Sequence, residues 1–406
     1  MKTVVIGAGA SGIVSAIFAS LNSEDVIVLE KEEKPLKKLL ITGNGRCNYF
    51  NEKFDIDSYH STDIDILKKI ITKENQDLFL SFFKNLGIVP RVINNCYYPY
   101  SNMASQVREL LLLKTSKEGV NIITSSYVKE IYKKENNFRV LYNDKEIICD
   151  RVIISTGSKA YPKTGSDGNG YSLALRANHT INKIYPGLTR LIGKKSYFKK
   201  WDGVRSNVII SLYENGRFLK QEVGELQFTK TGISGICVFN LSNMVSKGLL
   251  ENKKEEIRIN FMPFLEANSD YYLWFEKQTQ RTNNMISKIL EGFLNYKLID
   301  IILSLCNIGI NQYWYEIDDE KKELLIDSLT NFVFVPKETA FDSCQVCGGG
   351  VSLREINPFT MESKIVDSLY LTGEILDVVG NCGGYNLGFA FITGMLAGKR
   401  GLKWLD

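Results

Sequence analysis

Three glycines near the start of the chain have the spacing of a phosphate-binding turn. Gly7, Gly9 and Gly12 stand in the pattern GAGASG. The apolar run before them predicts a buried strand, and the apolar run at 13–21 predicts a buried helix. Gly7 permits a tight turn, Gly9 lets backbone N–H groups approach a pyrophosphate, and Gly12 lets the helix pack against the strand. The helix N-terminus would offer unpaired N–H groups to the anion. The sequence therefore predicts a dinucleotide site.

A carboxylate follows at the place where such a site needs one. The apolar run at 26–29 predicts a second strand, which ends at Glu30. The Glu30 carboxylate can accept hydrogen bonds from ribose hydroxyls, and it would repel a 2′-phosphate. We therefore expect FAD or NAD and not NADP. A secretory signal is the rival interpretation of the first residues, but three glycines within its apolar region argue against it.

A second glycine-containing loop follows the first unit. The stretch LLITGNGRCN at 39–48 has two glycines around Asn44, then Arg46, Cys47 and Asn48. A turn in solvent is the alternative, but the loop directly follows a βαβ unit whose ligand lies nearby. We expect this loop to lie against the cofactor, with Arg46 as a fixed positive charge.

The order of the next elements is typical of one class of cofactor domain. Helices are predicted at 63–71, 74–86 and 101–118, and strands at 88–98 and 120–124. Three short strands follow at 128–133, 138–142 and 146–149, and a strand at 151–155 ends in Thr156 and Gly157. This is the layout of FAD domains of the glutathione-reductase type. The backbone at Val128 would meet the adenine.

The middle of the chain contains no cofactor fingerprint. Pro186 is the predicted boundary, after which short strands dominate up to residue 268 and again at 331–340. The stretch 269–330 is predicted to be helical, with helices at 270–279, 284–292, 296–306 and 318–330. Ser234 lies between glycines, but the nucleophile spacing G-x-S-x-G is absent, so we interpret Ser234 as a helix cap. We expect a β-barrel domain (188–268 and 331–340) and a helical subdomain (269–330).

The end of the chain returns to cofactor-type sequence. A glycine-rich turn is predicted at 347–351 and a last strand at 369–372, followed by Gly373 and Glu374 over the pyrophosphate side of a flavin. A helix at 387–396 would aim its N-terminus at the flavin pyrimidine, where negative charge develops on reduction. Neither end of the chain is complete alone. We therefore expect one split, α/β Rossmann FAD domain formed by 1–187 and 341–406.

Composition excludes several classes of function. Net charge is +4, hydrophobic residues make up 44% and charged residues 24%, all ordinary for a globular protein. No apolar run is long enough to cross a bilayer, and the eight scattered cysteines suit a reducing cytoplasm. The two histidines, His60 and His179, offer little for a metal site, and none is predicted. Nucleic acid is not the expected partner; one basic patch is interpreted as a solvated face: Lys194, Lys195, Lys199, Lys200 and Arg205.

Motifs along nearly the whole chain resemble one bacterial flavoprotein family, the NAD(P)/FAD-dependent oxidoreductases that include aminoacetone-oxidase-like enzymes. The motifs are GAGASG at 7–12, LLITGNGRCN at 39–48, TGSDGNGY at 164–171, GELQFTKTGISG at 224–235, TMESK at 360–364 and LYLTGEILDVVGNCGGYN at 369–386. The resemblance implies a split FAD domain interrupted by a β-barrel and a helical subdomain. It also implies either reduction of unsaturated ketones, including bile acid intermediates, or oxidation of amines.

This chain departs from the family pattern in its cysteines. Cys347 stands where the family usually has Thr, Cys344 makes a C-x-x-C with it, and Cys382 precedes the twin glycines. With Cys47, several thiols are expected near the flavin. A redox-active dithiol is one interpretation. Thiols without a redox role are the interpretation we favour, because the C-x-x-C does not begin a helix.

The sequence thus predicts a cytoplasmic FAD-dependent oxidoreductase that passes hydride between flavin and a small organic substrate, with NAD(P)H as electron donor. An amine oxidase using O₂ and a flavin-dependent nucleic-acid-modifying or nucleic-acid-binding protein are the alternatives. Arg46, Tyr161 and Glu374 are catalytic candidates by position only. The predicted cofactor-binding residues are Gly7, Gly9, Ala10, Ser11, Gly12, Glu30, Lys31, Lys38, Gly43, Asn44, Gly45, Arg46, Cys47, Asn48, Val128, Thr156, Gly157, Gly373, Glu374, Asp377, Gly383, Gly384, Tyr385 and Asn386.

Overall fold

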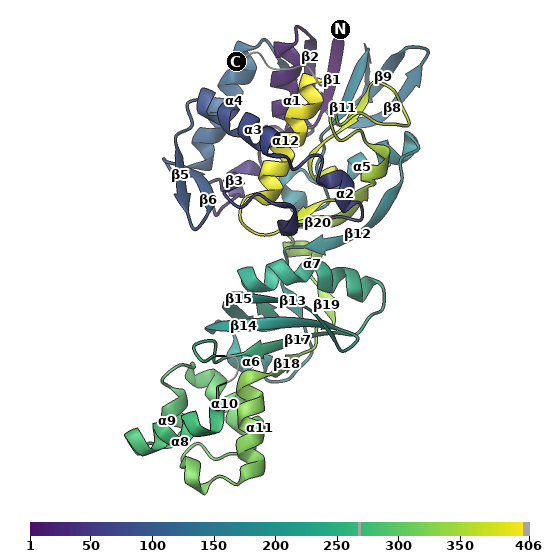
Figure 1. Ribbon diagram of the computed structural model, residues 1–406. Helices are drawn as coiled ribbons and strands as arrows, with labels where there is room; N and C mark the ends of the chain where they lie inside the picture. Colours follow the sequence, from purple (N-terminus) through teal and green to yellow (C-terminus); the bar gives the residue numbers. More distant parts are fainter. Residues whose placement is uncertain (267–268, 401–406) are drawn as a thin grey trace. The chain divides into compact units, whose positions relative to one another are not determined.

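The computed structural model describes residues 1–266 and 269–400. The chain forms two compact units (Figure 1). The first unit is discontinuous and comprises residues 1–185 together with the chain from 345 onward, and the second unit is the intervening stretch 186–344. The corresponding boundaries predicted from the sequence are 187 and 341.

A five-stranded parallel sheet forms the centre of the first unit. Its strand order is β21-β11-β1-β2-β7. The strands are β1 (Lys2–Ile6), β2 (Asp25–Leu29), β7 (Asn121–Ile123), β11 (Arg151–Ile154) and β21 (Leu369–Leu371). β21 pairs with β11, and β11 pairs with β1. β21, from the end of the chain, therefore completes the sheet that β1 begins. The predicted strands at these five places are confirmed.

Two apolar helices lie against each other beside this sheet (Figure 1). They are α1 (Ala10–Leu21) and α12 (Tyr385–Lys399), and most of their residues are buried. A Cβ on Gly398 would lie 2.6 Å from the carbonyl oxygen of Ser15, and a Cβ on Gly394 would overlap that of Ser11. Glycine at both positions lets the two helix backbones approach closely.

The remaining helices of the first unit cover its sides. They are α2 (Ile64–Leu67), α3 (Lys73–Asn85), α4 (Ala104–Lys117) and α5 (Asn169–Arg176). The helix predicted at 63–71 is thus a single turn. α3 buries Phe79, Phe82 and Phe83 at helical spacing, as the sequence pattern predicted.

Small antiparallel sheets complete the unit. The predicted meander is present as β8 (Val128–Lys134), β9 (Asn137–Tyr142) and β10 (Lys145–Cys149). The single strand predicted at 88–98 is instead a hairpin of β5 (Pro90–Ile93) and β6 (Cys96–Pro99), turning at Asn94 and Asn95 with positive φ, and β6 also pairs with β3 (Phe50–Asn51). β4 (Tyr59–His60) pairs with β22 (Val379–Gly380).

One predicted turn is a strand. The glycines at 348–350 lie in β20 (Val346–Val351), which pairs with β12 (Ile181–Gly187). A Cβ on Gly348 would collide with the ring of Tyr185, and a Cβ on Gly349 would overlap the carbonyl of Lys183. These glycines allow two strands to pack closely. A run of glycines is also typical of turns, and for that reason the sequence predicted a turn here.

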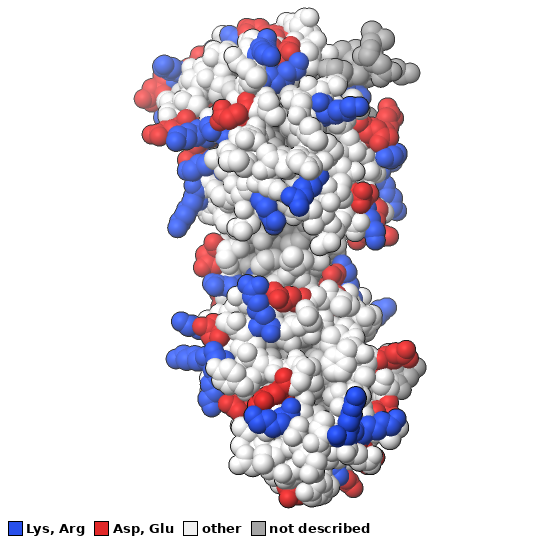
Figure 2. All heavy atoms as spheres, turned by 90° about the vertical axis from the view of Figure 1, so that its left-hand side faces the viewer, with Lys and Arg blue, Asp and Glu red and all other residues white. Residues whose placement is uncertain are grey.

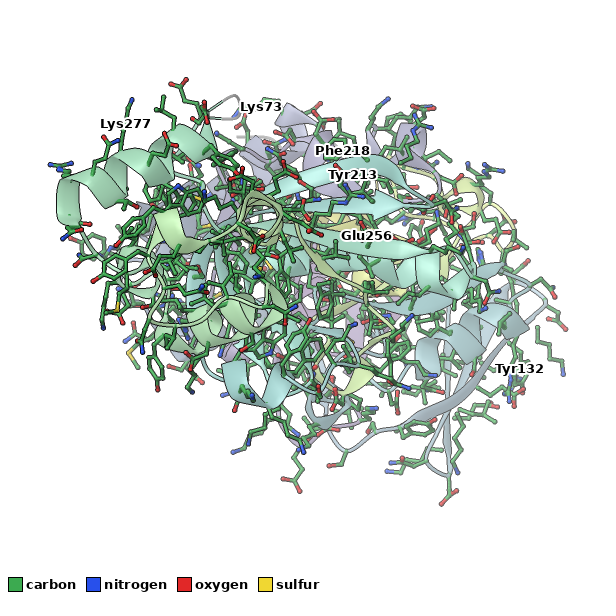
Figure 3. All side chains as sticks on the ribbon, turned by 90° about the horizontal axis from the view of Figure 1, so that it is seen from below. Lys73, Tyr132, Tyr213, Phe218, Glu256 and Lys277 are labelled. Atoms are coloured by element: carbon green, nitrogen blue, oxygen red, sulfur yellow. The ribbon has the colours of Figure 1, made fainter. Side chains whose placement is uncertain are left out.

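The second unit is built on a seven-stranded antiparallel sheet in the order β18-β17-β14-β15-β16-β13-β19. The strands are β13 (Leu191–Ile192), β14 (Arg205–Glu214), β15 (Arg217–Thr229), β16 (Gly232–Ser234), β17 (Glu255–Asn260), β18 (Phe332–Phe334) and β19 (Glu338–Thr339). A β-barrel was predicted, but the strands form a row with β18 and β19 at its edges. Figure 3 shows Tyr213 and Phe218 side by side on the β14–β15 hairpin, with ring centroids 5.8 Å apart.

The helices of the second unit share one core with this sheet. They are α6 (Phe198–Trp201), α7 (Ile236–Leu250), α8 (Tyr271–Thr282), α9 (Ile286–Leu290), α10 (Tyr296–Leu305) and α11 (Asp319–Thr330). The prediction that Ser234 caps a helix is wrong, because Ser234 lies in β16 and Gly235 is the N-cap of α7. The full length of α7, 15 residues, was not predicted. Cys237, Ser242 and Ser246 are buried on α7, and these small polar residues weakened its helical pattern. No helix within the described ranges is long and apolar enough to span a membrane.

Candidate cofactor site

The first glycine turn leaves space directly in front of α1. Gly7 has φ +98°, and a Cβ there would lie 2.6 Å from the carbonyl oxygen of Ser155. A Cβ on Gly12 would overlap the carbonyl oxygen of Gly7. By contrast, a Cβ on Gly9 would have no neighbour nearer than 4.0 Å. The backbone is therefore closed behind the turn and open at Gly9, the N-cap of α1, as a pyrophosphate next to the first-turn N–H groups of Ala10 and Ser11 requires.

Glu30 lies at the end of β2 beside this turn. Its carboxylate accepts the N–H of Ala8 at 2.6 Å and the N–H of Glu32 at 2.8 Å. Burial raises the pKa of Glu30, and these two backbone hydrogen bonds act in the opposite direction. A carboxylate has about four acceptor positions, so two remain for ribose hydroxyls. The residues present therefore fit the adenosine end of a dinucleotide.

β21 brings a second carboxylate to the same turn. A Cβ on Gly373 would lie 2.6 Å from the hydroxyl of Ser11, so the end of β21 touches the start of α1. Glu374 then accepts from Lys38 Nζ at 2.6 Å and from Ser158 Oγ at 3.1 Å. The Lys38–Glu374 ion pair joins segments from opposite ends of the chain. A carboxylate engaged in this way is a better positioning group than a proton donor.

The 39–48 loop folds back on itself beside the hairpin β5–β6. Arg46 Nε donates to the carbonyl of Gly43 at 3.1 Å, and its guanidinium lies 5.1 Å from the ring centroid of Tyr98. Cys47 is buried with φ +60°, and burial raises the pKa of its thiol to about 12. Gly45, by contrast, has open space where a Cβ would be, apart from the carbonyl of Leu40 at 3.9 Å. Asn44 also has positive φ. The loop would therefore present mainly backbone groups to a bound ligand.

A second glycine turn starts α12. Gly383 and Gly384 have φ of +125° and +94°, and a Cβ on Gly384 would lie 2.5 Å from the carbonyl oxygen of Phe50. In the amide orientation that satisfies both its atoms, Asn48 accepts from the N–H of Gly384 at 3.3 Å. Asn51 Nδ2 donates to the carbonyl of Gly383 at 2.8 Å. The turn is therefore fixed by side chains from the 48–51 segment.

Residues at the end of this turn are also held in place. Tyr59 donates its hydroxyl to the carbonyl of Tyr385 at 2.9 Å. Asn386 accepts the N–H of Gly380 at 2.8 Å and donates to its carbonyl at 2.7 Å. Tyr385 and Asn386 are among the residues predicted from the sequence, but Asn51 and Tyr59 are not, because nothing in their local pattern points to residues 380–386.

The other predicted site residues differ in what they contact. Thr156 Oγ1 is buried and has no hydrogen-bond partner within the described part of the chain, and Gly157 beside it has φ +74°. The carbonyl of Val128 accepts from Asn169 Nδ2 at 2.9 Å. Lys31 pairs with Asp167 at 2.5 Å. An unsatisfied hydroxyl at the end of β11 suits a polar ligand that would supply its partner.

Two predicted residues have other engagements. Asp377 is almost fully buried, and its carboxylate accepts from Asn182 Nδ2 at 2.7 Å and from the N–H of Thr62 at 3.3 Å. Those bonds tie three segments of the first unit together. Tyr161 has φ +54° and precedes the short helical turn at 162–164. Among the described residues, no hydrogen bond or ring contact joins Tyr161 to the glycine turns, so position remains the only argument for a catalytic role.

Comparison with known proteins decides the family. A model of the HI0933-like protein Rossmann domain matches residues 1–400. The chain belongs to the HI0933-like family. It is accordingly an enzyme of a FAD-dependent oxidoreductase family, with the Rossmann FAD domain that the sequence predicted.

Relatives of this HI0933-like protein have two different names. It is 38% identical to the 3-dehydro-bile acid delta(4,6)-reductase of Clostridium scindens, over 97% of each chain. It is 25% identical to the ribosomal RNA dihydrouridine synthase of Escherichia coli, over 96% of this chain and 94% of that one. Its fold is similar to that of a 3-ketosteroid-delta4-(5alpha)-dehydrogenase from Rhodococcus jostii, with a TM-score of 0.51, 11% identity, and coverage of 99% and 97%.

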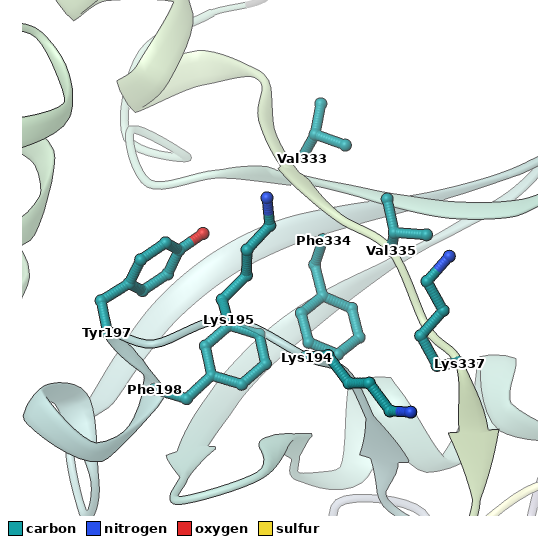
Figure 4. Close-up of a pocket in the computed structure, with 8 residues that line it drawn as sticks. All are labelled: Lys194, Lys195, Tyr197, Phe198, Val333, Phe334, Val335 and Lys337. Atoms are coloured by element: carbon teal, nitrogen blue, oxygen red, sulfur yellow. The ribbon is translucent and has the colours of Figure 1, made fainter.

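The second unit of the HI0933-like chain has a small basic pocket of about 40 Å³ (Figure 4). It is lined by Lys194, Lys195, Tyr197, Phe198, Val333, Phe334, Val335 and Lys337. That volume accommodates about one water molecule and no cofactor. The three ammonium groups point in different directions in Figure 4, so they do not converge on one anion. Groups of three or more potential metal ligands are absent from the described ranges.

Proposed function

We propose that this protein reduces a carbon–carbon double bond conjugated to a carbonyl in a small unsaturated ketone, using FAD and with NAD(P)H as the electron donor. The observation that carries the proposal is the 38% identity, over 97% of both chains, to a reductase named for a 3-dehydro-bile acid. Such a reduction adds hydride to the carbon β to the carbonyl and a proton to the α carbon. FAD, when bound, supplies the hydride.

The first unit supplies the groups that would hold and orient FAD. The N-terminus of α1, with Gly7, Gly9 and Gly12, would receive the pyrophosphate, and Glu30 the adenosine ribose. The N-terminus of α12, with its positive dipole end, would lie near the flavin pyrimidine and favour the reduced, negatively charged ring. Thr156 Oγ1 is a further donor available to the bound cofactor.

NAD(P)H would reach the flavin without a domain of its own. The sequence contains one G-x-G-x-x-G fingerprint of the dinucleotide type, at Gly7 to Gly12. The nicotinamide donor and the ketone would therefore use the same face of the flavin in turn, the donor leaving before the ketone binds. This order predicts ping-pong kinetics.

The test is anaerobic flavin spectroscopy on the purified holoenzyme. NADH or NADPH should bleach the flavin absorbance near 450 nm, and a steroid-type 4-en-3-one should restore it, whereas the saturated ketone should not. The Gly9→Val variant, which should not hold FAD, is the matched control. Restoration by neither ketone, with bleaching by an amine and peroxide formation in air, would replace the proposal by the amine oxidase alternative.

A second candidate is reduction of uridine in RNA. The observation that favours it is the 25% identity, over 96% of the chain, to a ribosomal RNA dihydrouridine synthase. The uracil C5–C6 double bond is also conjugated to a carbonyl, so the same hydride chemistry would serve. On the face shown in Figure 2, Lys and Arg are interspersed with Asp and Glu, whereas the dense basic stretch is confined to 194–205. Dihydrouridine in rRNA, measured by mass spectrometry with and without the enzyme, distinguishes the candidates.

A further inference from the structure

The structure narrows the question of which cysteines could take part in redox chemistry. Six of the eight cysteines are buried, and only Cys96 and Cys382 are partly exposed. The C-x-x-C pair is disfavoured, because Cys344 and Cys347 are both buried and Cys344 Sγ contacts the carbonyl of Phe341 at 3.3 Å. Cys47 is fully buried, and burial raises the pKa of its thiol to about 12; burial also raises the pKa of Cys96, but Cys96 is partly exposed, so accessibility and not acidity separates the two.

Cys96 and Cys382 share a neighbour in the first unit. A Cβ on Gly383 would lie 3.6 Å from Cys96 Sγ, and Cys382 directly precedes Gly383 in the chain. Consecutive Cα atoms are about 3.8 Å apart, so Cys96 Sγ lies near the segment that carries Cys382. Two cysteines that are 286 positions apart in sequence (382 minus 96) are thus brought to one turn.

This juxtaposition is held by the surrounding structure. Asn51 Nδ2 donates to the carbonyl of Gly383 at 2.8 Å and lies 3.7 Å from Cys96 Sγ. Asn51 is also the partner of Cys96 in the β3–β6 register. The positive φ angles of Gly383 and Gly384 fix the direction in which the chain passes Cys96. Cys382 lies two residues before the N-cap of α12, a 15-residue helix whose positive end favours a thiolate.

We propose that Cys96 and Cys382 form an oxidisable thiol pair at the N-terminal turn of α12. The oxidant is a hydroperoxide. One thiolate attacks the peroxide oxygen, the O–O bond breaks, and a sulfenic acid forms with loss of hydroxide. The second thiolate then displaces the sulfenic oxygen, giving the disulfide. With hydrogen peroxide as oxidant, two thiols lose two electrons and two protons, and two molecules of water are formed.

The disulfide would join β6 to the turn that begins α12. That turn is the one expected next to the flavin. The effect of the disulfide on enzyme activity therefore rests on the proposed function, whereas formation of the disulfide does not. If FAD binds as proposed, its reduced form would release hydrogen peroxide on meeting O₂, which supplies an oxidant for the pair. Oxidation of the pair would then restrict the α12 turn and slow turnover, and a thiol reductant would restore it.

The experiment maps all eight thiols in the holoenzyme. Protein is treated with hydrogen peroxide without substrate, remaining thiols are blocked, and disulfides are identified by peptide mass spectrometry before and after dithiothreitol. We expect a Cys96–Cys382 peptide pair that dithiothreitol removes, with the six buried cysteines alkylated only after denaturation. In Cys96→Ser, Cys382 should stop at sulfenic acid, which dimedone traps; Cys149→Ser is the control and should leave the pair unchanged.

Enzyme turnover is measured on the same samples. Wild-type turnover should fall at least several-fold after peroxide treatment and recover with dithiothreitol, while Cys96→Ser should show no such reversible loss. A disulfide without any change in turnover would overturn only the proposed effect on activity. Peroxide treatment that yields no linked peptide in the wild-type protein, or links Cys344 with Cys347 instead, would overturn the pair itself.

Discussion

The two helices that meet in the first unit, α1 and α12, both begin in glycine turns, but the turns are fixed in different ways. In the α1 turn, Gly12 packs against the carbonyl of Gly7, five positions earlier, and Gly7 packs against Ser155 at the end of the neighbouring strand. In the α12 turn, Gly383 and Gly384 are fixed by Asn48, Phe50 and Asn51. The first turn depends mostly on local backbone sterics, and the second depends on side chains more than three hundred positions away.

Because they are fixed differently, the two turns leave different patterns in the sequence. A turn closed by its own glycines leaves a short sequence pattern, because each glycine is required by a close backbone contact within or beside the turn. A turn closed by distant amides leaves only its glycines, and its partners look like ordinary polar residues. Four substitutions test this contrast.

The largest effect is expected for Gly12→Val. The added Cβ would overlap the backbone carbonyl of Gly7, which has no freedom to move because β1 and α1 are both buried. Overpacking of this kind costs about 1–3 kcal/mol and more where backbone is involved. We expect little folded protein, measured by expression and by thermal unfolding of the apoprotein. Gly9→Val is the matched control; equal stability of the two variants would show that α1 can shift, and the local description of its turn would be wrong.

Gly9→Val should instead abolish FAD binding. The Cβ at this position enters space that the protein leaves open, so stability of the apoprotein should stay within about 0.5 kcal/mol of wild type. The side chain would occupy the place of the pyrophosphate and block the α1 amides. The purified protein should be colourless, and its FAD dissociation constant should rise by more than about a hundredfold, or about 2.7 kcal/mol. FAD retention at wild-type occupancy would contradict the assignment of this turn.

Glu30→Ala should weaken FAD binding less. Charge-assisted hydrogen bonds contribute about 1.5–3 kcal/mol, so loss of the ribose contact should raise the dissociation constant by roughly one to two orders of magnitude. Glu30→Gln keeps the shape of the side chain and should lie between wild type and Glu30→Ala. Fluorescence titration of the apoprotein with FAD measures both, and an unchanged constant in both variants would show that Glu30 serves only the N–H groups of Ala8 and Glu32.

Asn51→Ala tests the distant partners of the α12 turn and should have the smallest effect. It removes the hydrogen bond to the carbonyl of Gly383, for a cost of about 1 kcal/mol. The loosened turn should also raise the rate at which Cys382 reacts with a small alkylating agent. Thermal unfolding and thiol alkylation measure the two effects. Gln76→Ala, which removes a bond to the carbonyl of Phe54, is the control and should leave the alkylation rate unchanged.

Sequence patterns predicted the parallel sheet, both long buried helices and the β8–β10 meander, because buried apolar runs and glycine spacing are local signals. They predicted only a short helix at the start of α7, because its buried Ser242 and Ser246 interrupt its apolar face, and they did not predict β20, whose three glycines resemble a turn. They also missed Asn51 and Tyr59, whose roles arise only when β3, β4 and the 380–386 segment meet. In the site, residues set by backbone geometry were predictable, and side-chain partnerships across the fold were not.

Because the first unit is discontinuous, the two units are completed in a fixed order during synthesis on the ribosome. The second unit is one uninterrupted stretch and has all its strands once residue 344 has emerged. The first unit begins earlier yet is completed later, because β21 and α12 follow the second unit in the chain. Until then β11 has an unpaired edge and α1 an uncovered apolar face, the kind of surface that chaperones bind. We expect nascent chains stopped near residue 340 to protect the second unit from protease and leave the first sensitive. The sheet of the first unit can therefore be completed only after the second unit has been synthesised.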